Sequence, residues 1–191
     1  MELVFATGNA HKVAEAQLIL GKALPDLLIL AHDGSDPLES GVSFLENAQI
    51  KARAAFQATG KPAFADDSGI CVEVMGGAPG IFSAIWAGGR DDIENRDLLL
   101  KQLEDIPAEN RMASFVCTIA LVEASGETSF TGVWPGRISM GAAGNGGFGY
   151  DPVFVPEGFE VTAAELDSDV KSSFSHRSMA MRQMASFLTS R

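Results

Sequence analysis

The chain has 191 residues, of which 46% are hydrophobic and 20% are charged, and its formal net charge is −11. This length and composition are typical of a globular protein that buries a sizeable core in one domain or in two closely joined lobes. The acidic balance excludes long DNA or RNA as a partner, because such binding requires a basic surface, and no apolar run approaches the roughly 18 residues of a membrane helix.

The first third of the chain predicts strands that alternate with helices. Apolar residues at 2–6 and 27–31 indicate short strands, and apolar residues at helical spacing over 13–24 indicate a helix between them. A second helix is indicated over 43–60, because an S-x-x-E capping box stands at its start and Gly60 at its end.

The rest of the chain predicts an α/β fold with a partly antiparallel sheet, because β-α units are followed by a long hairpin. No internal repeat or flexible linker interrupts it. The expected elements are strands around 63–65 and 70–75, a helix over 91–105, a hairpin of 112–124 with 127–134, a strand at 152–155, a short helix near 162–167 and a terminal helix from about 175.

The two cysteines, Cys71 and Cys117, lie in apolar segments with the character of strands. We expect buried free thiols there and not a disulfide. With no signal peptide visible at the start of the chain, this favours a reducing, cytoplasmic location.

The passage FATGNAHK, residues 5–12, is the first candidate binding element. Lys12 in the first turn of a helix opposes the helix dipole unless an anion lies between it and the exposed backbone N–H groups. Gly8 permits a close approach of the backbone, and Thr7 and Asn9 add side-chain donors. The alternative is an ordinary turn in which Asn9 caps the helix and Lys12 is solvated.

A second cationic helix start lies near the other end of the chain. Ser175 is a plausible N-cap, and His176 and Arg177 follow immediately inside the helix. Two potential cations at the positive end of a helix are unfavourable unless an anion is bound. The alternative is a solvated helix start in which His176 packs locally.

The segment GAAGNGGFGYDP, residues 141–152, combines five glycines with two aromatic rings. Glycines permit tight turns, and Phe148 and Tyr150 offer flat faces to a base or another ring. Asp151 is held extended before Pro152, where its carboxylate can accept from a base or a ribose. A mobile surface loop is the alternative, but two large rings disfavour exposure, so we favour ligand binding.

Acidic residues form the last candidate. Glu39 lies in a polar loop, and Asp66 and Asp67 follow a strand. Mg²⁺ takes one or two carboxylates and completes its coordination with waters and substrate phosphates, and a nearby carboxylate can accept a proton from an attacking water. Lys51, on the intervening helix, can neutralise a phosphate. Each acid alone can be a turn residue or a surface charge; with the other candidates they indicate a nucleotide polyphosphate, a hard metal and water.

Six motifs occur in a fixed order along the chain: TGNAHK, FLENAQIKA, ADDSGICV, GGAPGIFSA, GGFGYDPVF and SHRSMAMRQ. In this order they resemble the inosine/xanthosine triphosphate pyrophosphatases, and the resemblance runs from residue 4 to about residue 185. It implies one elongated α/β domain over 1–191, with a long twisted mixed sheet and two lobes around a central cleft. It also implies a homodimer and Mg²⁺-dependent cleavage of ITP, dITP or XTP to the monophosphate and pyrophosphate.

The resemblance also implies roles for individual residues. Asp67 would accept the proton of the attacking water and, with Glu39, would bind Mg²⁺, while Asp66 would be a supporting neighbour. The aromatic loop and the pair of His176 and Arg177 would surround the base and read its 6-keto group. Substrate contacts are implied for Thr7, Gly8, Asn9, Ala10, His11, Lys12, Lys51, Ser68, Phe148, Gly149, Tyr150, Asp151, Lys171, His176 and Arg177.

One position departs from the family pattern. Ile85 stands where relatives commonly carry an arginine, and Trp86 follows it. Any phosphate or ion-pair role of that arginine is therefore absent or supplied by another residue. Arg90 is a candidate for it. Two other functions stay open: a pyrophosphatase that prefers modified pyrimidine nucleotides, and a sensor that binds nucleotides without hydrolysing them.

Overall fold

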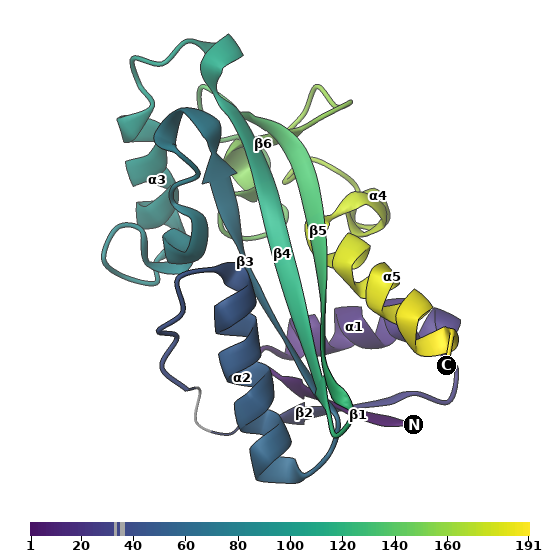
Figure 1. The fold of residues 1–191 in the computed structure, drawn as a ribbon. Helices are drawn as coiled ribbons and strands as arrows, with labels where there is room; N and C mark the ends of the chain where they lie inside the picture. Colours follow the sequence, from purple (N-terminus) through teal and green to yellow (C-terminus); the bar gives the residue numbers. More distant parts are fainter. Residues whose placement is uncertain (33, 35–36) are drawn as a thin grey trace. The chain divides into compact units, whose positions relative to one another are not determined.

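The computed structural model describes residues 1–32, 34 and 37–191, and the side chain of His11 lies outside the described part. The described residues form the expected mixed α/β fold, with a six-stranded sheet in the order β2-β1-β3-β4-β5-β6 (Figure 1). The strands are β1 (Glu2–Ala6), β2 (Leu28–His32), β3 (Ala63–Val72), β4 (Met112–Glu123), β5 (Gly126–Ile138) and β6 (Phe154–Pro156). The α-helices are α1 (Ala10–Ala23), α2 (Phe44–Thr59), α3 (Asp92–Gln102), α4 (Ser168–Phe174) and α5 (His176–Thr189).

The chain divides into two compact units. Unit 1 contains Met1–Asp67, Cys117–Gly132 and Arg177–Arg191, and unit 2 contains Ser68–Val116 and Val133–His176. In β3 the boundary falls between Asp67 and Ser68. The acidic pair therefore belongs to unit 1, and the glycine-rich aromatic loop belongs to unit 2.

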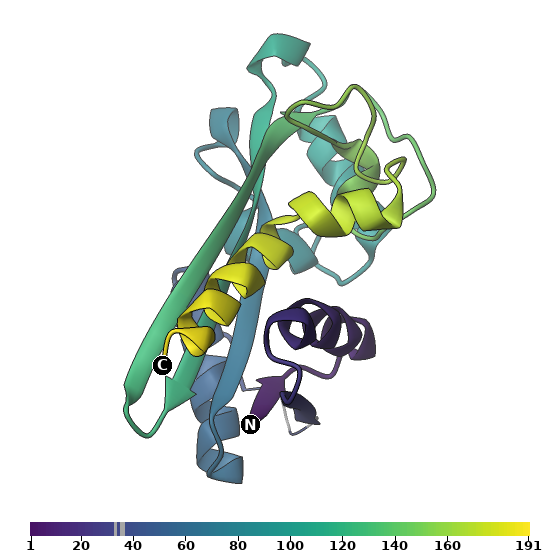
Figure 2. The ribbon, with the colours of Figure 1, turned by 90° about the vertical axis from the view of Figure 1, so that its right-hand side faces the viewer.

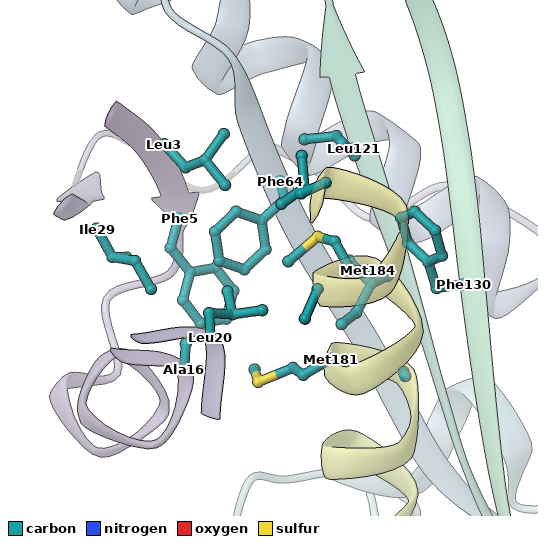
Figure 3. Close-up of a cluster of buried hydrophobic side chains, with 14 of the residues drawn as sticks. Leu3, Phe5, Ala16, Leu20, Ile29, Phe64, Leu121, Phe130, Met181 and Met184 are labelled. Carbon is teal, nitrogen blue, oxygen red and sulfur yellow. The ribbon is translucent and has the colours of Figure 1, made fainter. Parts of the chain in front are cut away.

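Unit 1 is a three-layer structure, in which β1 pairs in parallel with both β2 and β3. Figures 1 and 2 show α2 on one face of these strands and α1 and α5 on the other. The larger core lies on the side of α1 and α5, where the rings of Phe5 and Phe64 stack with centroids 4.3 Å apart. Leu20 of α1 and Met184 of α5 pack into the same cluster (Figure 3).

The opposite face of β3 carries small side chains. Ala65 packs there with Ala48 and Ala52 of α2 in a second buried cluster. Successive side chains of a strand point to opposite faces of the sheet, so Phe64 and Ala65 lie in different layers. The same alternation places Asp66 on the face of Phe64 and Asp67 on the face of Ala65.

The expected limits of α2 are confirmed by its capping contacts. The Ser43 side chain accepts from the backbone N–H of Glu46 at 3.2 Å, and Gly60 ends the helix with a left-handed φ of 66°. The reciprocal contact of the capping box differs, because the Glu46 carboxylate accepts from the backbone N–H of Val42.

The strand prediction around the acidic pair was wrong. Instead of two strands that flank Asp66 and Asp67, β3 runs without interruption from Ala63 to Val72. Gly69 is part of this strand, and a side chain there would collide with the backbone of Gly80. A continuous strand is tolerated because each carboxylate meets polar partners on its own face.

Two later elements also differ from expectation. The helix expected near 162–167 is a turn, and α4 follows it, where the Asp167 side chain caps the helix by accepting from the N–H of Asp169. The strand expected at 152–155 begins only at Phe154, after a 3₁₀ turn over Asp151–Val153.

Two leucines of α1 provide a matched test of the unit 1 core. Leu20 is fully buried, whereas Leu18 is 57% exposed. We expect Leu20→Ala to lower the free energy of unfolding by roughly 2–5 kcal/mol, because it removes apolar contacts and leaves a cavity. Leu18→Ala should change it by no more than about 0.5 kcal/mol. Urea denaturation measures both, and equal losses would contradict the assignment of this core.

Candidate active site

Asp66 and Asp67 lie on opposite faces of β3. Asp66 continues the layer of Phe64, and its contacts come from α1 and α5. Asp67 continues the layer of Ala65, and its contacts come from α2. Two carboxylates that are adjacent in sequence therefore have different hydrogen-bond and ion-pair partners.

Asp66 is an ionised carboxylate held between two cations. It is 2% exposed, and the Lys12 ammonium donates to both of its oxygens at 3.0 Å. The Arg177 Nε donates to Oδ2 at 3.1 Å, and the Arg177 Nη1 lies 3.4 Å from the Glu15 carboxylate. Burial alone would raise the pKa of Asp66, but Lys12 and Arg177 together hold that pKa well below its ordinary value.

These contacts change the interpretation of both cationic helix starts. Asp66 supplies the negative charge that Lys12 and Arg177 require. Asn9 caps α1 as the ordinary alternative predicts, because its Oδ1 accepts from the N–H of Lys12 at 3.3 Å. The Lys12 side chain, by contrast, is ion-paired and not merely solvated.

Asp67 lies in a second polar cluster. The Asn47 amide donates to its Oδ2 at 3.2 Å, and the Lys51 ammonium lies 3.6 Å from its Oδ1. The same ammonium lies 3.1 Å from Oε1 of Glu39, so both carboxylates approach one cation. Burial raises the pKa of Asp67, while Lys51 and the Asn47 hydrogen bond only partly oppose this shift.

Asn47 was missed by the sequence analysis. A local signal was present, since Asn47 and Lys51 are four residues apart and therefore share one face of α2. Asn47 was not distinguished from other polar helix residues because its partner, Asp67, lies 20 residues away.

The Glu39 and Asp67 pair is suited to a hard divalent cation. In the described ranges 1–32, 34 and 37–191, no group of three or more His, Cys, Asp or Glu side chains is arranged to hold a metal. Two carboxylates nevertheless match Mg²⁺, which usually retains several waters and takes further ligands from substrate phosphates. A divalent cation would also offset the repulsion between Glu39 and Asp67 that contributes to the raised pKa of Asp67.

In unit 2, Asp151 organises the glycine-rich aromatic loop. Its Oδ2 accepts from the backbone N–H of Phe148 at 2.8 Å and from the Lys171 ammonium at 2.6 Å. The ammonium lies 5.4 Å from the centroid of the Phe148 ring, which is 63% exposed. Gly147 is required here, because a Cβ at that position would collide with the Asp151 carboxylate.

The two rings of this loop have different environments. Tyr150 is buried, and its hydroxyl donates to the backbone carbonyl of Ser83 at 2.8 Å. Burial and the charge of Asp92 raise the pKa of Tyr150. The expectation that both rings offer free faces is therefore wrong for Tyr150, whereas Phe148 keeps an exposed face.

A pocket of about 240 Å³ lies beside the same loop, lined by Asp92, Arg96, residues 144–149 and Pro152.

His176, also in unit 2, stacks on Phe115 with ring centroids 4.8 Å apart, as the local-packing alternative predicts.

The remaining predicted residues occupy less defined positions. Gly8 and Ala10 are exposed at the start of α1, Ser68 is half-buried in β3, and the side chain of His11 lies outside the described residues. Ile85 is 46% exposed. Its neighbour Trp86 donates from Nε1 to Gln102, and Arg90 is exposed.

The opposite environments of the two acids predict opposite effects on stability. Asp66→Asn should lower the free energy of unfolding by roughly 3–5 kcal/mol near neutral pH, because it removes the buried negative charge that pairs with both Lys12 and Arg177. The fold lowers the pKa of Asp66 from its ordinary value of 3.8, so this contribution is fully present above that value and is lost as the pH falls through the lowered pKa.

The matched variant Asp67→Asn should change stability by less than about 1 kcal/mol, because burial already disfavours the charge of Asp67. Denaturation in metal-free buffer compares the stabilities of the two variants. The range of about pH 4 to 8 begins near the ordinary pKa of aspartate. A larger loss for Asp67→Asn would contradict the assignment.

No helix within the described residues is long and apolar enough to cross a membrane.

The chain is similar in sequence to curated proteins over nearly its whole length. The chain is 54% identical over 182 residues to the dITP/XTP pyrophosphatase of Leifsonia xyli subsp. xyli, with 94% of this chain and 92% of the relative covered. It is 49% identical over 188 residues to the dITP/XTP pyrophosphatase of Streptomyces coelicolor, with 95% and 94% covered.

Two solved structures are similar to the chain in fold as well as in sequence. A HAM1 protein from Coxiella burnetii superposes with a TM-score of 0.92 at 40% identity, over 100% of both chains. The Staphylococcus aureus Ham1 protein superposes with a TM-score of 0.91 at 35% identity, over 98% of both chains. The model of the Ham1 family matches residues 3–187, and the chain therefore belongs to the Ham1 family.

Proposed function

We propose that the chain is a nucleoside-triphosphate pyrophosphatase that converts ITP, dITP and XTP to the monophosphate and pyrophosphate. The observation that carries this proposal is the cluster in which Asp67 and Glu39 approach the Lys51 ammonium, separate from the ion-paired Asp66. Relatives about half identical to the chain and matched over nearly their whole length are dITP/XTP pyrophosphatases, which supports the substrate class.

Glu39 and Asp67 would hold Mg²⁺. When bound, this ion would offset the negative charge of the triphosphate. Lys51, whose pKa is raised by Asp67, Asp66 and Glu39 despite its burial, remains a cation that can pair with a phosphate.

Asp67 would act as general base. Its raised pKa makes it a better proton acceptor than an ordinary aspartate, and the Asn47 amide fixes one of its oxygens. Asp67 takes the proton from water as the water oxygen bonds to phosphorus. The bond between the α- and β-phosphates breaks, and its electron pair leaves with pyrophosphate.

Substrate contacts are proposed separately for each unit. In unit 1, the segment from Thr7 to Lys12 would bind phosphates, and Arg177 would lie near the base. In unit 2, the exposed Phe148 ring would stack on the purine, as aromatic side chains do with bases. Further contacts in unit 2 are proposed for Ser68, Gly149, Tyr150, Asp151, Lys171 and His176.

We further propose that residues 1–191 act as a single catalytic domain, that two copies form a homodimer, and that the enzyme is cytoplasmic. The two cysteines support the last point, because both are free thiols and such thiols persist in a reducing compartment.

Product analysis tests the reaction class. With Mg²⁺ and ITP, the purified chain should release pyrophosphate and IMP, because the bond between the α- and β-phosphates is the one cleaved. Orthophosphate as the first inorganic product would indicate a phosphatase, and binding without turnover would indicate a sensor. A parallel panel of XTP, dITP, GTP, dUTP and methylated dUTP should show the highest kcat/KM for ITP, dITP or XTP; a preference for a pyrimidine would overturn the assigned substrate.

Replacement of the proposed base tests its role. Asp67→Asn should lower kcat by at least about a hundredfold, since general base catalysis contributes roughly 10²–10⁴-fold. Nucleotide binding, measured by calorimetry in the absence of metal, should change by less than about threefold, because the amide keeps the shape of the side chain and its place beside Asn47. A variant with substantial turnover would remove Asp67 from the role of base.

A further inference from the structure

Two consecutive backbone amides of the glycine-rich aromatic loop are bound by carboxylates from different segments. The N–H of Phe148 donates to Asp151 at 2.8 Å, within the loop itself. The N–H of Gly149 donates to Oδ2 of Asp92 at 2.9 Å, and Asp92 lies 57 residues away in the sequence. The two peptide groups that flank Phe148 are therefore each held by a carboxylate.

The loop requires such restraint because its composition favours many conformations. Five of the nine residues from Gly141 to Gly149 are glycine, and glycine loses more backbone freedom on ordering than any other residue. Gly149 itself has a left-handed φ of 58°, and Gly147 has a φ of 72°. A charged acceptor at the Gly149 amide stabilises one of these conformations, since hydrogen bonds to ionised groups are stronger than neutral ones.

Asp92 is placed on a firm support. It stands in the first turn of α3, which is capped by the Asp91 side chain through the N–H groups of Ile93 and Glu94. One turn later, buried Asn95 accepts from the N–H of Ala87 at 2.6 Å and donates to two backbone carbonyls. Asp92 therefore reaches the loop from a helix that is itself fixed to its surroundings in unit 2.

Phe148 is the side chain that benefits from this restraint. Its ring is largely exposed, although the N–H groups of both peptides that flank Phe148 donate to carboxylates. An exposed aromatic ring on a fixed backbone can stack on a flat ligand without first becoming ordered, which lowers the entropic cost of binding.

We propose that Asp92 is a positioning residue that holds the Phe148 ring in the orientation that stacks on the purine base. This inference rests on the proposed pyrophosphatase function and adds a residue of α3 to its substrate recognition. Asp92 touches neither the phosphates nor the reacting water in this assignment. It acts through the Gly149 amide.

The inference predicts a selective effect of Asp92→Ala on nucleotide affinity. KM for ITP and XTP should rise about tenfold, as expected for loss of one charge-assisted hydrogen bond, while kcat changes by less than about twofold. The inhibition constant of inorganic tripolyphosphate, which has phosphates but no base, should also change by less than about twofold, because the phosphate-binding residues of unit 1 are unaltered.

Glu94→Ala is the matched control. Glu94 is another exposed acid in the first turn of α3, so its removal has the same effect on the helix dipole, and both KM and kcat should stay at wild-type values. An equal rise in KM for Glu94→Ala would assign the effect to the helix and overturn the inference. An unchanged KM for Asp92→Ala, or a parallel rise in the tripolyphosphate inhibition constant, would overturn it as well.

Asp92→Asn keeps the acceptor and removes the charge. It should raise KM about two- to threefold, and if Asp92→Ala does not fold, an unchanged KM for this variant is the overturning result. The wild-type assay separates the two proposals: turnover of ITP without sensitivity to Asp92 refutes the positioning role alone, whereas absence of turnover refutes the pyrophosphatase function and this inference with it.

Discussion

The site depends on the alternation of side chains along a single strand. Because β3 passes through the acidic pair without interruption, Asp66 and Asp67 must point to opposite faces. One face offers Lys12 and Arg177, and the other offers Asn47 and Lys51. A turn at this position would let both carboxylates face the same side, where their repulsion would require an additional cation.

The two acids consequently divide the work of structure and chemistry. Asp66 fixes the first turns of two helices that are distant in sequence, since Lys12 belongs to α1 and Arg177 to α5. Asp67 retains a raised pKa and lies beside Glu39, which favours roles in binding a metal and accepting a proton. Asp66 therefore stabilises the fold, whereas Asp67 keeps a charge that burial disfavours, as expected where activity requires a destabilised group.

Sequence reasoning succeeded where the determining interactions are local. The limits of α2 follow from Ser43 and Gly60, and Asn9 caps α1 as its position indicates. The continuity of β3 could not be predicted in the same way, because the partners of Asp66 lie 54 and 111 residues away in the sequence. Without those partners, two adjacent acids are more plausible in a turn than in a buried strand.

The candidate site shows the same division. Motifs identified the acids, the two cationic helix starts and the aromatic loop, but not what each group contacts. Tyr150 and Phe148 look equivalent in the sequence, and only packing distinguishes the buried ring from the exposed one. Asn47 and Asp92 carried no strong signal, because an amide in a helix and an acid in a first helical turn are common.

The most direct measurement is the titration of the two carboxyl groups by carbon-13 NMR of the metal-free protein. Relative to the ordinary aspartate pKa of 3.8, the fold lowers the pKa of Asp66 and raises the pKa of Asp67. Asp66 should titrate well below that value and Asp67 above it. Equal pKa values, or the reverse order, would contradict the separation of the two acids on which the proposed function depends.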